Sequence, residues 1–554
     1  MDEKSSHRRR WWALAVMCMS LAVISLDNTI LNVALPALVR NLHASISQLQ
    51  WIVDAYILVF AGLLLTTGSI GDRFGRKGAL STGLAMFGLG SLISAFATSA
   101  TQLIFTRAFM GIGAALIMPA TLSLLTNVFP DPKERGRAIG VWAGVVGASG
   151  AIGPVIGGVI LQHFWWGAIF LINVPIAVVA LVAGRFLLPS SRDPNAPPLD
   201  PIGALLSVAG LVAVLWAIIQ APAKGWSDTS VIGGFLVGVA VLAAFSQWEL
   251  HCDHPMLDMR YFKNRRFSAA NTGLTLLYFA MFGQFFLTTQ YLQTVLGYSA
   301  LQAGVRMLPT AAVMIVVAPL SPRLVERVGT KRVMGGGLLL AASGVALMST
   351  VPVSNGYSHL LRAMALMSAG MGLVMAPATE SIMGSLPPSK AGVGSAMNDT
   401  TRQLGGALGV AVLGSVLATT YRPGVAARLA HLGVGGDVIA KAKDSLGGAV
   451  AVARTLPGPL GQEVTAAAKS EFVHAFSGAL IVASIVVAFA ALVIFALLPA
   501  RATDAQETPE GALDGIASLS FAGAEGVLRG DAAIVALESV DRTAARDLTA
   551  EATP

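Results

Sequence analysis

The sequence predicts an all-α membrane protein with about fourteen transmembrane helices. Of its 554 residues 55% are hydrophobic and only 12% are charged, whereas soluble proteins carry about 25% charged residues. Apolar stretches of about twenty residues, long enough to cross a bilayer as a helix, recur along the whole length. The expected spans are 11–36, 48–70, 79–98, 102–127, 137–161, 167–188, 201–220, 230–248, 268–291, 303–321, 333–351, 359–383, 393–419 and 472–498.

The first apolar stretch follows His7-Arg8-Arg9-Arg10 and superficially resembles a secretory signal. It is longer than a signal, contains Asp27 and has no small-residue cleavage site. We therefore expect residues 11–36 to be a permanent span.

The distribution of lysine and arginine predicts the orientation of the spans. These residues concentrate in the N-terminus and the even-numbered loops, whereas the short odd-numbered loops hold few. Basic loops stay on the cytoplasmic side, so both termini are expected to be cytoplasmic. The basic positions are Lys4, Arg8 to Arg10, Arg73, Arg76, Lys77, Lys133, Arg135, Arg137, Arg185, Arg192, Arg260, Lys263, Arg265, Arg266, Arg323, Arg327, Lys331, Arg332 and Lys390.

Several functional classes are excluded by composition. The net charge of +7 lies in short clusters between apolar spans and not on one helix face, so nucleic acid is not an expected partner. The two cysteines, Cys18 and Cys252, provide no disulfide framework or metal cluster. No phosphate-binding loop, zinc-site spacing or nucleophile elbow occurs. We expect neither an enzyme nor a cofactor or metal site.

An internal repeat predicts two related halves. Residues 72–77 (Asp-Arg-Phe-Gly-Arg-Lys), after the second span, are echoed by residues 326–331 (Glu-Arg-Val-Gly-Thr-Lys), after the tenth. Duplicated halves around a central cavity are a transporter architecture. We expect a monomer with a basic N-terminus (1–10), a first six-helix half (11–188), two inserted helices (189–250), a second half (251–499) with an extracellular loop at 420–471, and a disordered cytoplasmic tail (500–554).

Three charged residues lie inside predicted spans, where an ionisable group is costly and usually functional. At about 1.5 Å per residue, Asp54 and Arg107 lie roughly 9 Å from the outer ends of their spans, and Asp27 roughly 14 Å. All three fall in one outer layer, where an arginine can hold a carboxylate ready for proton exchange. A structural ion pair, or side chains facing a wet vestibule, is the alternative for each.

The loop after the second span resembles the signature loop of the major facilitator superfamily. Asp72 can bond the N-termini or arginines of neighbouring helices, and Gly75 permits a tight turn. Such contacts would latch the cytoplasmic side, although a plain basic turn is the alternative. The expected gating residues are Gly68, Asp72, Arg73, Gly75, Arg76 and Lys77.

Small residues line one stripe of the fifth span, where they allow two helices to approach closely. The segment 150–158 resembles the motif that marks antiporter branches of the same superfamily, and generic helix packing is the alternative. The motif residues are Gly150, Gly153, Pro154, Gly157 and Gly158.

Taken together, residues 11–498 resemble the fourteen-helix drug:proton antiporters of the EmrB/QacA type. Matching stretches include residues 26–36, 107–115 and 170–175, and 392–406. The resemblance implies that Asp27 is the principal proton- and cation-responsive carboxylate and Arg107 its coupling partner. It also implies that Asp54, beside Trp51 and Tyr56, is a substrate-facing acid.

Other residues suit a substrate pathway less specifically. Glu380 lies near the cytoplasmic end of span 12, and Asp399 can simply neutralise Arg402 three residues later. Stripes of aromatic and methionine side chains would suit varied lipophilic cations, but lipid contact and helix packing are equal alternatives. The candidates in these stripes are Tyr278, Phe282 and Phe285 on span 9 and Met371 on span 12, with Met364, Met367 and Met375.

The sequence thus predicts a proton-coupled exporter of small, lipophilic and often cationic compounds in the cytoplasmic membrane, working by alternating access. A dedicated exporter of one endogenous product on the same scaffold is the nearest rival. A proton symporter, and a receptor or scaffold that uses the outer loop or the tail, are the others.

Overall fold

The computed structural model describes residues 3–192, 199–354, 356–386 and 391–499, and every regular element within them is helical. Thirteen of these helices are long and apolar enough to cross a membrane, and the bent helix α5 makes a fourteenth. The predicted fold class and number of spans are therefore confirmed for the part of the chain that is described. The tail at 500–554, expected to be disordered and cytoplasmic, lies outside it.

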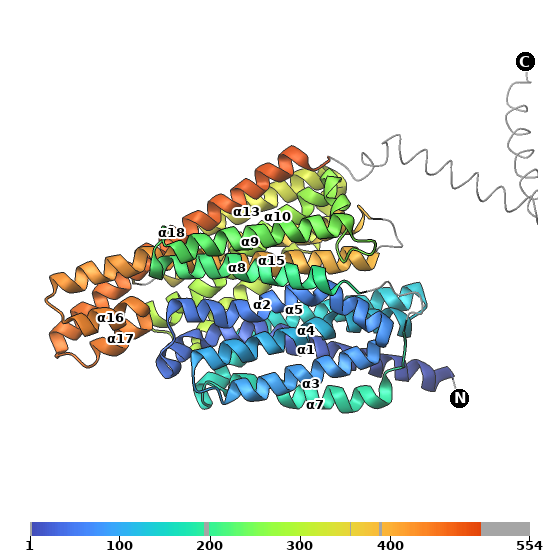
Figure 1. Ribbon diagram of the computed structural model, residues 1–554, viewed down its shortest axis with the longest axis horizontal. Coiled ribbons are helices and arrows are strands. Elements are labelled where there is room, and N and C mark those ends of the chain that lie inside the picture. The colour runs from blue at the N-terminus through green and yellow to red at the C-terminus, as the bar shows by residue number, and fades with distance from the viewer. Residues whose placement is uncertain (1–2, 193–198, 355, 387–390, 500–554) are drawn as a thin grey trace, which may run out of the picture. The chain divides into compact units, whose positions relative to one another are not determined.

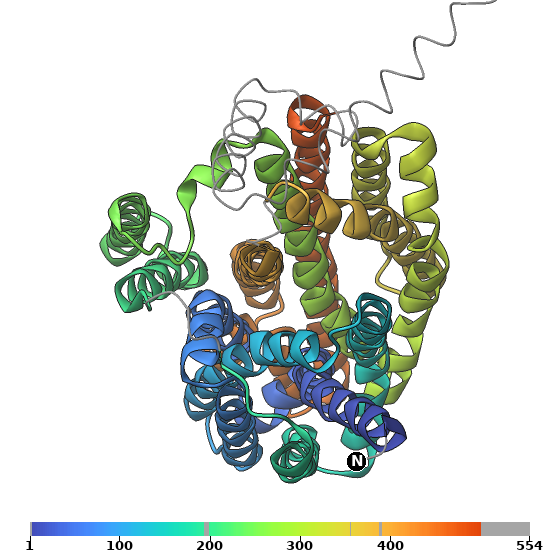
Figure 2. The same cartoon turned by 90° about the vertical axis from the view of Figure 1, so that its right-hand side faces the viewer.

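The helices form two groups, and a separate pair lies beside both of them (Figures 1 and 2). The first group contains α1 (Glu3–Leu42), α2 (Ile46–Phe74), α3 (Arg76–Ala95), α4 (Ala100–Val128), α5 (Pro132–His163), α6 (Ala168–Leu171) and α7 (Asn173–Leu187). The inserted pair is α8 (Pro201–Lys224) and α9 (Thr229–His251), followed by the short η1 (Met259–Lys263). The second group contains α10 (Arg265–Gln290), the π-helical turn η2 (Tyr291–Val295), α11 (Ala300–Val317), α12 (Leu320–Val328), α13 (Thr330–Met348), α14 (Tyr357–Met383), α15 (Ala391–His431), α16 (Gly436–Asp444), α17 (Leu446–Ala453) and α18 (Gly458–Leu497).

The internal repeat has a counterpart in helix capping. The Ser45 hydroxyl accepts a hydrogen bond from the Gln48 amide (3.3 Å), and the Gln48 side chain accepts one from the Ser45 amide (3.0 Å). Ser299 and Gln302 start α11 in the same way. This reciprocal capping box satisfies amides that a helix start leaves unpaired, so the second span of each group begins with the same local structure.

Both of these spans also end alike. Gly75 separates α2 from α3 with φ of 118°, and Gly329 separates α12 from α13 with φ of 91°. Residues other than glycine rarely adopt such φ values. The two copies of the sequence motif therefore form equivalent turns at the end where α1 begins, which we call the predicted cytoplasmic end.

The segment expected as an outer loop at 420–471 is mostly helical. Helix α15 continues to His431, α16 and α17 form a short hairpin, and α18 starts at Gly458, well before the expected residue 472. Figure 1 shows these extensions at the end opposite to the start of α1, which we call the predicted outer end. The sequence of this Ala- and Gly-rich segment predicts only short helical patches, at 439–446 and 463–472, and packing stabilises the longer helices: Phe472 and Phe476 of α18 are buried, and Tyr421 of α15 stands edge-on to Phe472.

The inserted helix α8 lies against both groups. Pro222 has no amide hydrogen, so the carbonyl of Ile218, one turn earlier, lacks its helical donor. The Ser415 hydroxyl of α15 donates to this carbonyl at 2.8 Å. From the first group, the Ser47 hydroxyl donates to the next carbonyl, Ile219, at 3.3 Å. One turn of α8 thus joins helices from the two groups.

The two groups touch closely at the predicted outer end. The Gln50 side chain of α2 donates to the Ala411 carbonyl of α15 at 2.8 Å, and the Gln293 side chain of η2 donates to the Val33 carbonyl of α1 at 2.7 Å. On the same level α5 packs against α11. Nearer the predicted cytoplasmic end of α5, Gly144 has open space where a side chain would start. The molecule is therefore closed at the predicted outer end.

Candidate functional site

A buried ion pair lies at the centre of the first group. Asp27 of α1 and Arg107 of α4 form a salt bridge between the Oδ2 and Nη1 atoms, and they are 3% and 1% exposed. Arg107 also donates from Nε to the Ile52 carbonyl of α2 at 3.2 Å, and its guanidinium lies 4.3 Å from the centre of the Tyr56 ring. The arginine therefore ties three helices together at the level of the carboxylate.

Asn173 completes this cluster. It begins α7, is fully buried, and donates from Nδ2 to Asp27 Oδ1 at 3.0 Å and to the Ser91 hydroxyl at 3.3 Å. Its stretch, residues 170–175, was noted for family resemblance, but no role was assigned to the amide. A lone amide in an otherwise apolar span is the sequence signal that could have indicated this residue, but nothing in the sequence connects it with Asp27.

The two buried charges of this cluster depend on each other for their stability. Removing one partner of a buried ion pair leaves an uncompensated charge and typically costs about 3–5 kcal/mol. Both oxygens of Asp27 have partners, one from Arg107 and one from Asn173. A proton arriving at Asp27 would weaken the hold of Arg107, so protonation and the packing of α1 against α4 are physically coupled.

Asp54 lies next to this cluster in a different environment. It is fully buried on α2, and neither carboxylate oxygen has a hydrogen-bond partner among the described residues. It lies one turn after Gln50, which contacts α15, so it belongs to the face of α2 that points to the second group. A buried carboxyl without a donor is expensive and is suited to a proton or a cationic ligand.

The predicted lining residues on α2 differ in burial. Tyr56 is fully buried beneath Arg107 and stands edge-on to Phe87 of α3, with ring centres 6.4 Å apart. Trp51 is only partly buried and packs against the core. Tyr56 thus belongs to the ion-pair cluster in this conformation.

The signature loop makes contacts to two neighbouring helices. Asp72, in the last turn of α2, pairs with Arg76, the first residue of α3, at 2.7 Å, so it contacts an arginine at the start of the next helix. Lys77 contacts another helix: its Nζ donates to the carbonyls of Arg185 (2.7 Å) and Leu188 (2.9 Å) at the end of α7. A lysine is favourable there because a helix C-terminus carries partial negative charge.

The remaining loop residues have local positions. Arg73 is exposed and lies 5.9 Å from the ring centre of Phe74. Gly68 faces Pro119 of α4, whose Cβ would lie 3.6 Å from an added methyl group. Neither residue contacts the second group in the contacts described.

The small residues of α5 serve two interfaces. Gly153 packs against Thr29 of α1, and Gly157 lies against Ile30. Gly158 faces α11: a Cβ there would lie 2.8 Å from the Leu301 amide nitrogen. Pro154 contacts Gly304 of α11, and Gly150 has open space. The motif therefore brings α5 into close contact with helices of both groups. Close helix packing, the alternative to a specific antiporter role, is thus present at this segment.

A second polar cluster lies in the second group. Asp399 and Arg402 of α15 form the neutralising pair that was the alternative expectation, with 3.9 Å between Oδ1 and Nη1. Arg402 also donates to the Thr379 hydroxyl at 3.1 Å and lies 5.6 Å from the ring centre of Tyr278. Glu380, next to Thr379 on α14, is exposed.

The aromatic and methionine stripes are largely packed. Phe282 lies over Gly406 of α15, where a Cβ would be 3.1 Å from the ring, and Phe285 is partly buried. Met371 is 3% exposed, and its neighbour Gly370 touches the backbone of α13. Met371 is therefore buried in this conformation, and its predicted role in lining a substrate pathway stays a prediction.

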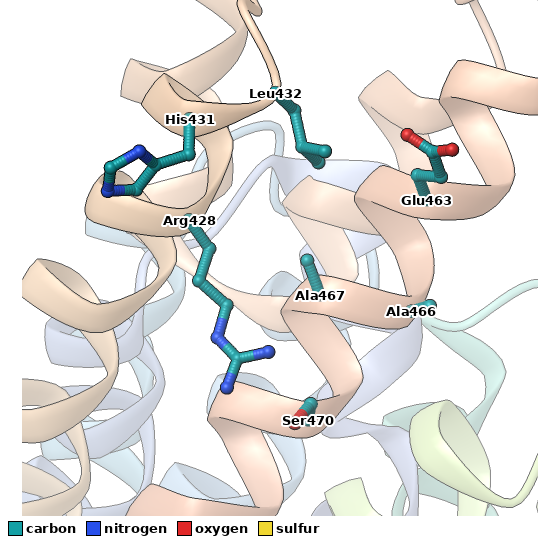
Figure 3. A pocket seen from close by; sticks show the side chains of 7 residues that line it. All are labelled: Arg428, His431, Leu432, Glu463, Ala466, Ala467 and Ser470. Carbon is teal, nitrogen blue, oxygen red and sulfur yellow. The ribbon is translucent and has the colours of Figure 1, made fainter.

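A pocket of about 560 Å³ lies far from these carboxylates, between α15 and α18 at the predicted outer end. Figure 3 shows Arg428 and His431 on one wall and Glu463 and Ser470 on the other. Beside it, Arg428 forms an ion pair with Glu471. Among the described residues, no cluster of three or more His, Cys, Asp and Glu could hold a metal ion.

Comparison with known families and structures gives a consistent result. Residues 17–410 match the family model described as Major Facilitator Superfamily. Among solved structures, the fold resembles a bacterial homolog of the human lysosomal transporter Spinster in an inward-facing and unoccupied conformation, with a TM-score of 0.61 and 16% identity. The match covers 89% of this chain and 98% of that chain.

Curated relatives cover most of the chain. The multidrug efflux pump LfrA of Mycolicibacterium smegmatis is 35% identical over 486 residues, 88% of this chain and 96% of the relative. The tetracenomycin C resistance and export protein of Streptomyces glaucescens is 35% identical, covering 91% and 94%. The methyl viologen resistance protein SmvA of Salmonella typhimurium is 34% identical, covering 85% and 95%.

Proposed function

Because this chain belongs to the major facilitator superfamily, and is therefore a multi-pass membrane transporter and not an enzyme, we propose that it is a proton-coupled antiporter. It exports lipophilic, often cationic compounds across the cytoplasmic membrane. The relatives' names point to multidrug and antibiotic efflux, with methyl viologen as a cationic example.

The buried cluster of Asp27, Arg107 and Asn173 carries the proposal of proton coupling. Its two charges persist at a depth where an unused ion pair would be costly. When Asp27 takes up a proton, Arg107 loses its counter-ion, and the bond that joins α1 to α4 weakens. The protonation state of one carboxyl can therefore bias the packing of the first group.

Asp54 supports the choice of cationic substrates. Its two unpartnered oxygens lie in the buried face of α2 toward the second group. A lipophilic cation that entered between the groups would supply the missing positive charge. The uptake of a proton by the same carboxyl would remove that attraction and favour release.

The close packing at the predicted outer end supports alternating access. In this conformation α5 and α11 touch through Gly158 and Gly304, so the substrate would enter from the cytoplasm. Export requires these helices to part. A membrane potential contributes about 2.3 kcal/mol per elementary charge per 100 mV, enough for roughly fiftyfold accumulation for each net charge moved.

A dedicated exporter of one endogenous compound is the second candidate. It is favoured by relatives named for single antibiotics, among them tetracenomycin C and puromycin. Both candidates share the scaffold and the proposed coupling site. They differ in breadth, which a panel of unrelated cations and neutral antibiotics in an efflux-deficient host separates.

The decisive experiment is ethidium transport in everted membrane vesicles under an imposed pH gradient. Wild-type protein is expected to accumulate ethidium when the lumen is acidic and to acidify the exterior as it does so. Asp27→Asn cannot exchange a proton at this position and is expected to abolish both signals. Asp253→Asn, an exposed acid in the loop after α9, is the matched control and should transport normally.

Expression and folding of each variant are checked by size-exclusion chromatography of the detergent-solubilised protein. Undiminished, gradient-driven transport by Asp27→Asn would remove this residue from the coupling role. Wild-type transport without accompanying proton movement would overturn antiport itself.

A further inference from the structure

A pair of buried acids joins the two inserted helices at the predicted cytoplasmic end, away from the Asp27 cluster. Asp200 precedes α8 and is 6% exposed, and Glu249 lies in the last turn of α9 and is 2% exposed. Their carboxyl groups lie within hydrogen-bonding reach of each other. Both face Gly203, since a Cβ on that glycine would meet Asp200 Oδ2 and Glu249 Oε1 together.

Asp200 is fully supplied with donors. Its Oδ1 accepts the Gly203 amide at 2.8 Å, as an N-cap residue does, and the Trp248 indole at 2.9 Å. Its Oδ2 lies 3.1 Å from the same indole nitrogen. Both donors are N–H groups of the protein, as is usual for an N-cap side chain, so Asp200 acts as a hydrogen-bond acceptor in this pair.

Glu249 has the opposite environment. Its Oε2 accepts the Leu257 amide at 2.9 Å, but its Oε1 has no hydrogen-bond partner among the described residues. This orphaned oxygen points at Asp200, which offers another acceptor. Two ionised carboxylates in contact and away from water repel strongly, and such pairs generally hold one proton.

No basic side chain in the described ranges forms an ion pair with either acid. Helix α2 faces α8 with Gly62 and Ser47, and α15 faces it with Ser415. The loop before η1 contributes the main-chain amide of Leu257. Charged groups nearby are turned elsewhere: Asp258 accepts the Arg260 amide, the His251 ring contacts the Gln247 carbonyl, and Arg192, Asp253 and His254 are exposed.

We propose that Glu249 holds a proton on Oε1 at neutral pH and donates it to Asp200 Oδ2, which makes this pair a proton-binding site separate from the transport site. The proton converts the contact of two like charges into one hydrogen bond and gives the orphaned oxygen a partner. It comes from the cytoplasm and returns there when the pair ionises.

The site has a structural consequence. It connects the start of α8, the end of α9 and the loop that leads into α10. Loss of the proton places two negative charges together in a buried position and loosens all three segments. The folded state binds a proton that the unfolded chain releases at neutral pH, so the stability provided by this site falls as the pH rises.

The test uses the full chain purified in detergent. Infrared difference spectra of wild type minus Glu249→Gln at neutral pH should contain the carbonyl band of a protonated carboxylic acid. Glutamine retains a donor toward Asp200 and an acceptor for Leu257, so this variant is expected to fold. Asp253→Asn is the control and should leave the band unchanged.

Thermal unfolding between about pH 6 and pH 9 provides the second measurement. The midpoint of the wild type is expected to fall more steeply with pH than that of Glu249→Gln. Asp200→Asn offers an amide donor to Glu249, so Glu249 should ionise and the infrared band should vanish although the glutamate remains. This variant replaces Glu249→Gln in the test if Glu249→Gln does not fold.

The proposal is overturned if the absorption of the protonated carboxylic acid is as strong in Glu249→Gln and in Asp200→Asn as in the wild type. It is equally overturned if the thermal midpoints of the wild type and Glu249→Gln change with pH in parallel. It is also overturned if added sodium, potassium or calcium ions raise the midpoint of the wild type but not of Glu249→Gln, because a metal cation would then occupy the pair. None of these results depends on whether the protein transports drugs.

Discussion

Replacement of Gly304 by alanine is expected to open the predicted outer end. Gly304 of α11 rests on the backbone of α5, and an alanine Cβ there would lie 2.6 Å from the Pro154 carbonyl carbon. This is closer than Cβ atoms normally come to backbone, and a helix backbone cannot move aside as a flexible side chain can. The closed contact between α5 and α11 must therefore widen.

The magnitude follows from the cost of overpacking, about 1–3 kcal/mol for an extra methyl group in a tight site. The clash exists only where α5 and α11 touch, so it destabilises the closed outer end and leaves the opened state unaffected. Since about 1.4 kcal/mol is a factor of ten, the ratio of closed to open molecules should fall roughly 5- to 150-fold. Substrate loading from the cytoplasm should slow accordingly.

The assay is a distance measurement between spin labels at Gln162 and Val305, which are exposed on α5 and α11. Cys18 and Cys252 are replaced by serine beforehand. Gly304→Ala should move most of the distance distribution to longer values. Gly144→Ala on α5, the helix that Gly304 contacts, is the control, because open space surrounds that glycine. If both variants gave the wild-type distribution, the reasoning from backbone contact would be refuted.

Two further substitutions test local contacts. Ser415→Ala should leave the Ile218 carbonyl buried and unpaired, at a cost of about 1–3 kcal/mol. The thermal midpoint in detergent should therefore drop. Ser343→Ala, which removes an exposed hydrogen bond within one helix, should have little effect. Lys77→Met should lower the thermal midpoint and the transport rate, because it removes a cation from the end of α7, a loss of about 0.3–1 kcal/mol. Arg73→Met changes an exposed charge, and equal losses in that variant would contradict a specific role for Lys77.

Much of the fold could be predicted because the bilayer limits the choices. Spans must be about twenty residues long and apolar, and basic loops mark one side. The outer segment at 420–471 escaped this logic. Its helices are stabilised by packing against each other, and the contact between Tyr421 and Phe472 joins residues that are far apart in the sequence.

The site was predictable in its charges but not in its polar partners. Asp27, Asp54 and Arg107 stand out because charges in apolar spans are rare. Asn173 has no charge, and its contact with Asp27 joins residues far apart in the sequence. Likewise, the contact of Asp72 with Arg76 at the start of α3 is local and could be expected, whereas the contact of Lys77 with the end of α7 joins residues far apart in the sequence.

The bond pattern around Pro222 connects the inserted pair to the alternating access proposed above. Ser47 and Ser415 hold adjacent carbonyls of a single turn, yet they come from groups that must separate if the outer end is to open. Helix α8 can follow only one of them. In the proposed cycle, an opening of the outer end would break one of these two bonds, and shortening either serine side chain would leave α8 bonded to only one of the two groups.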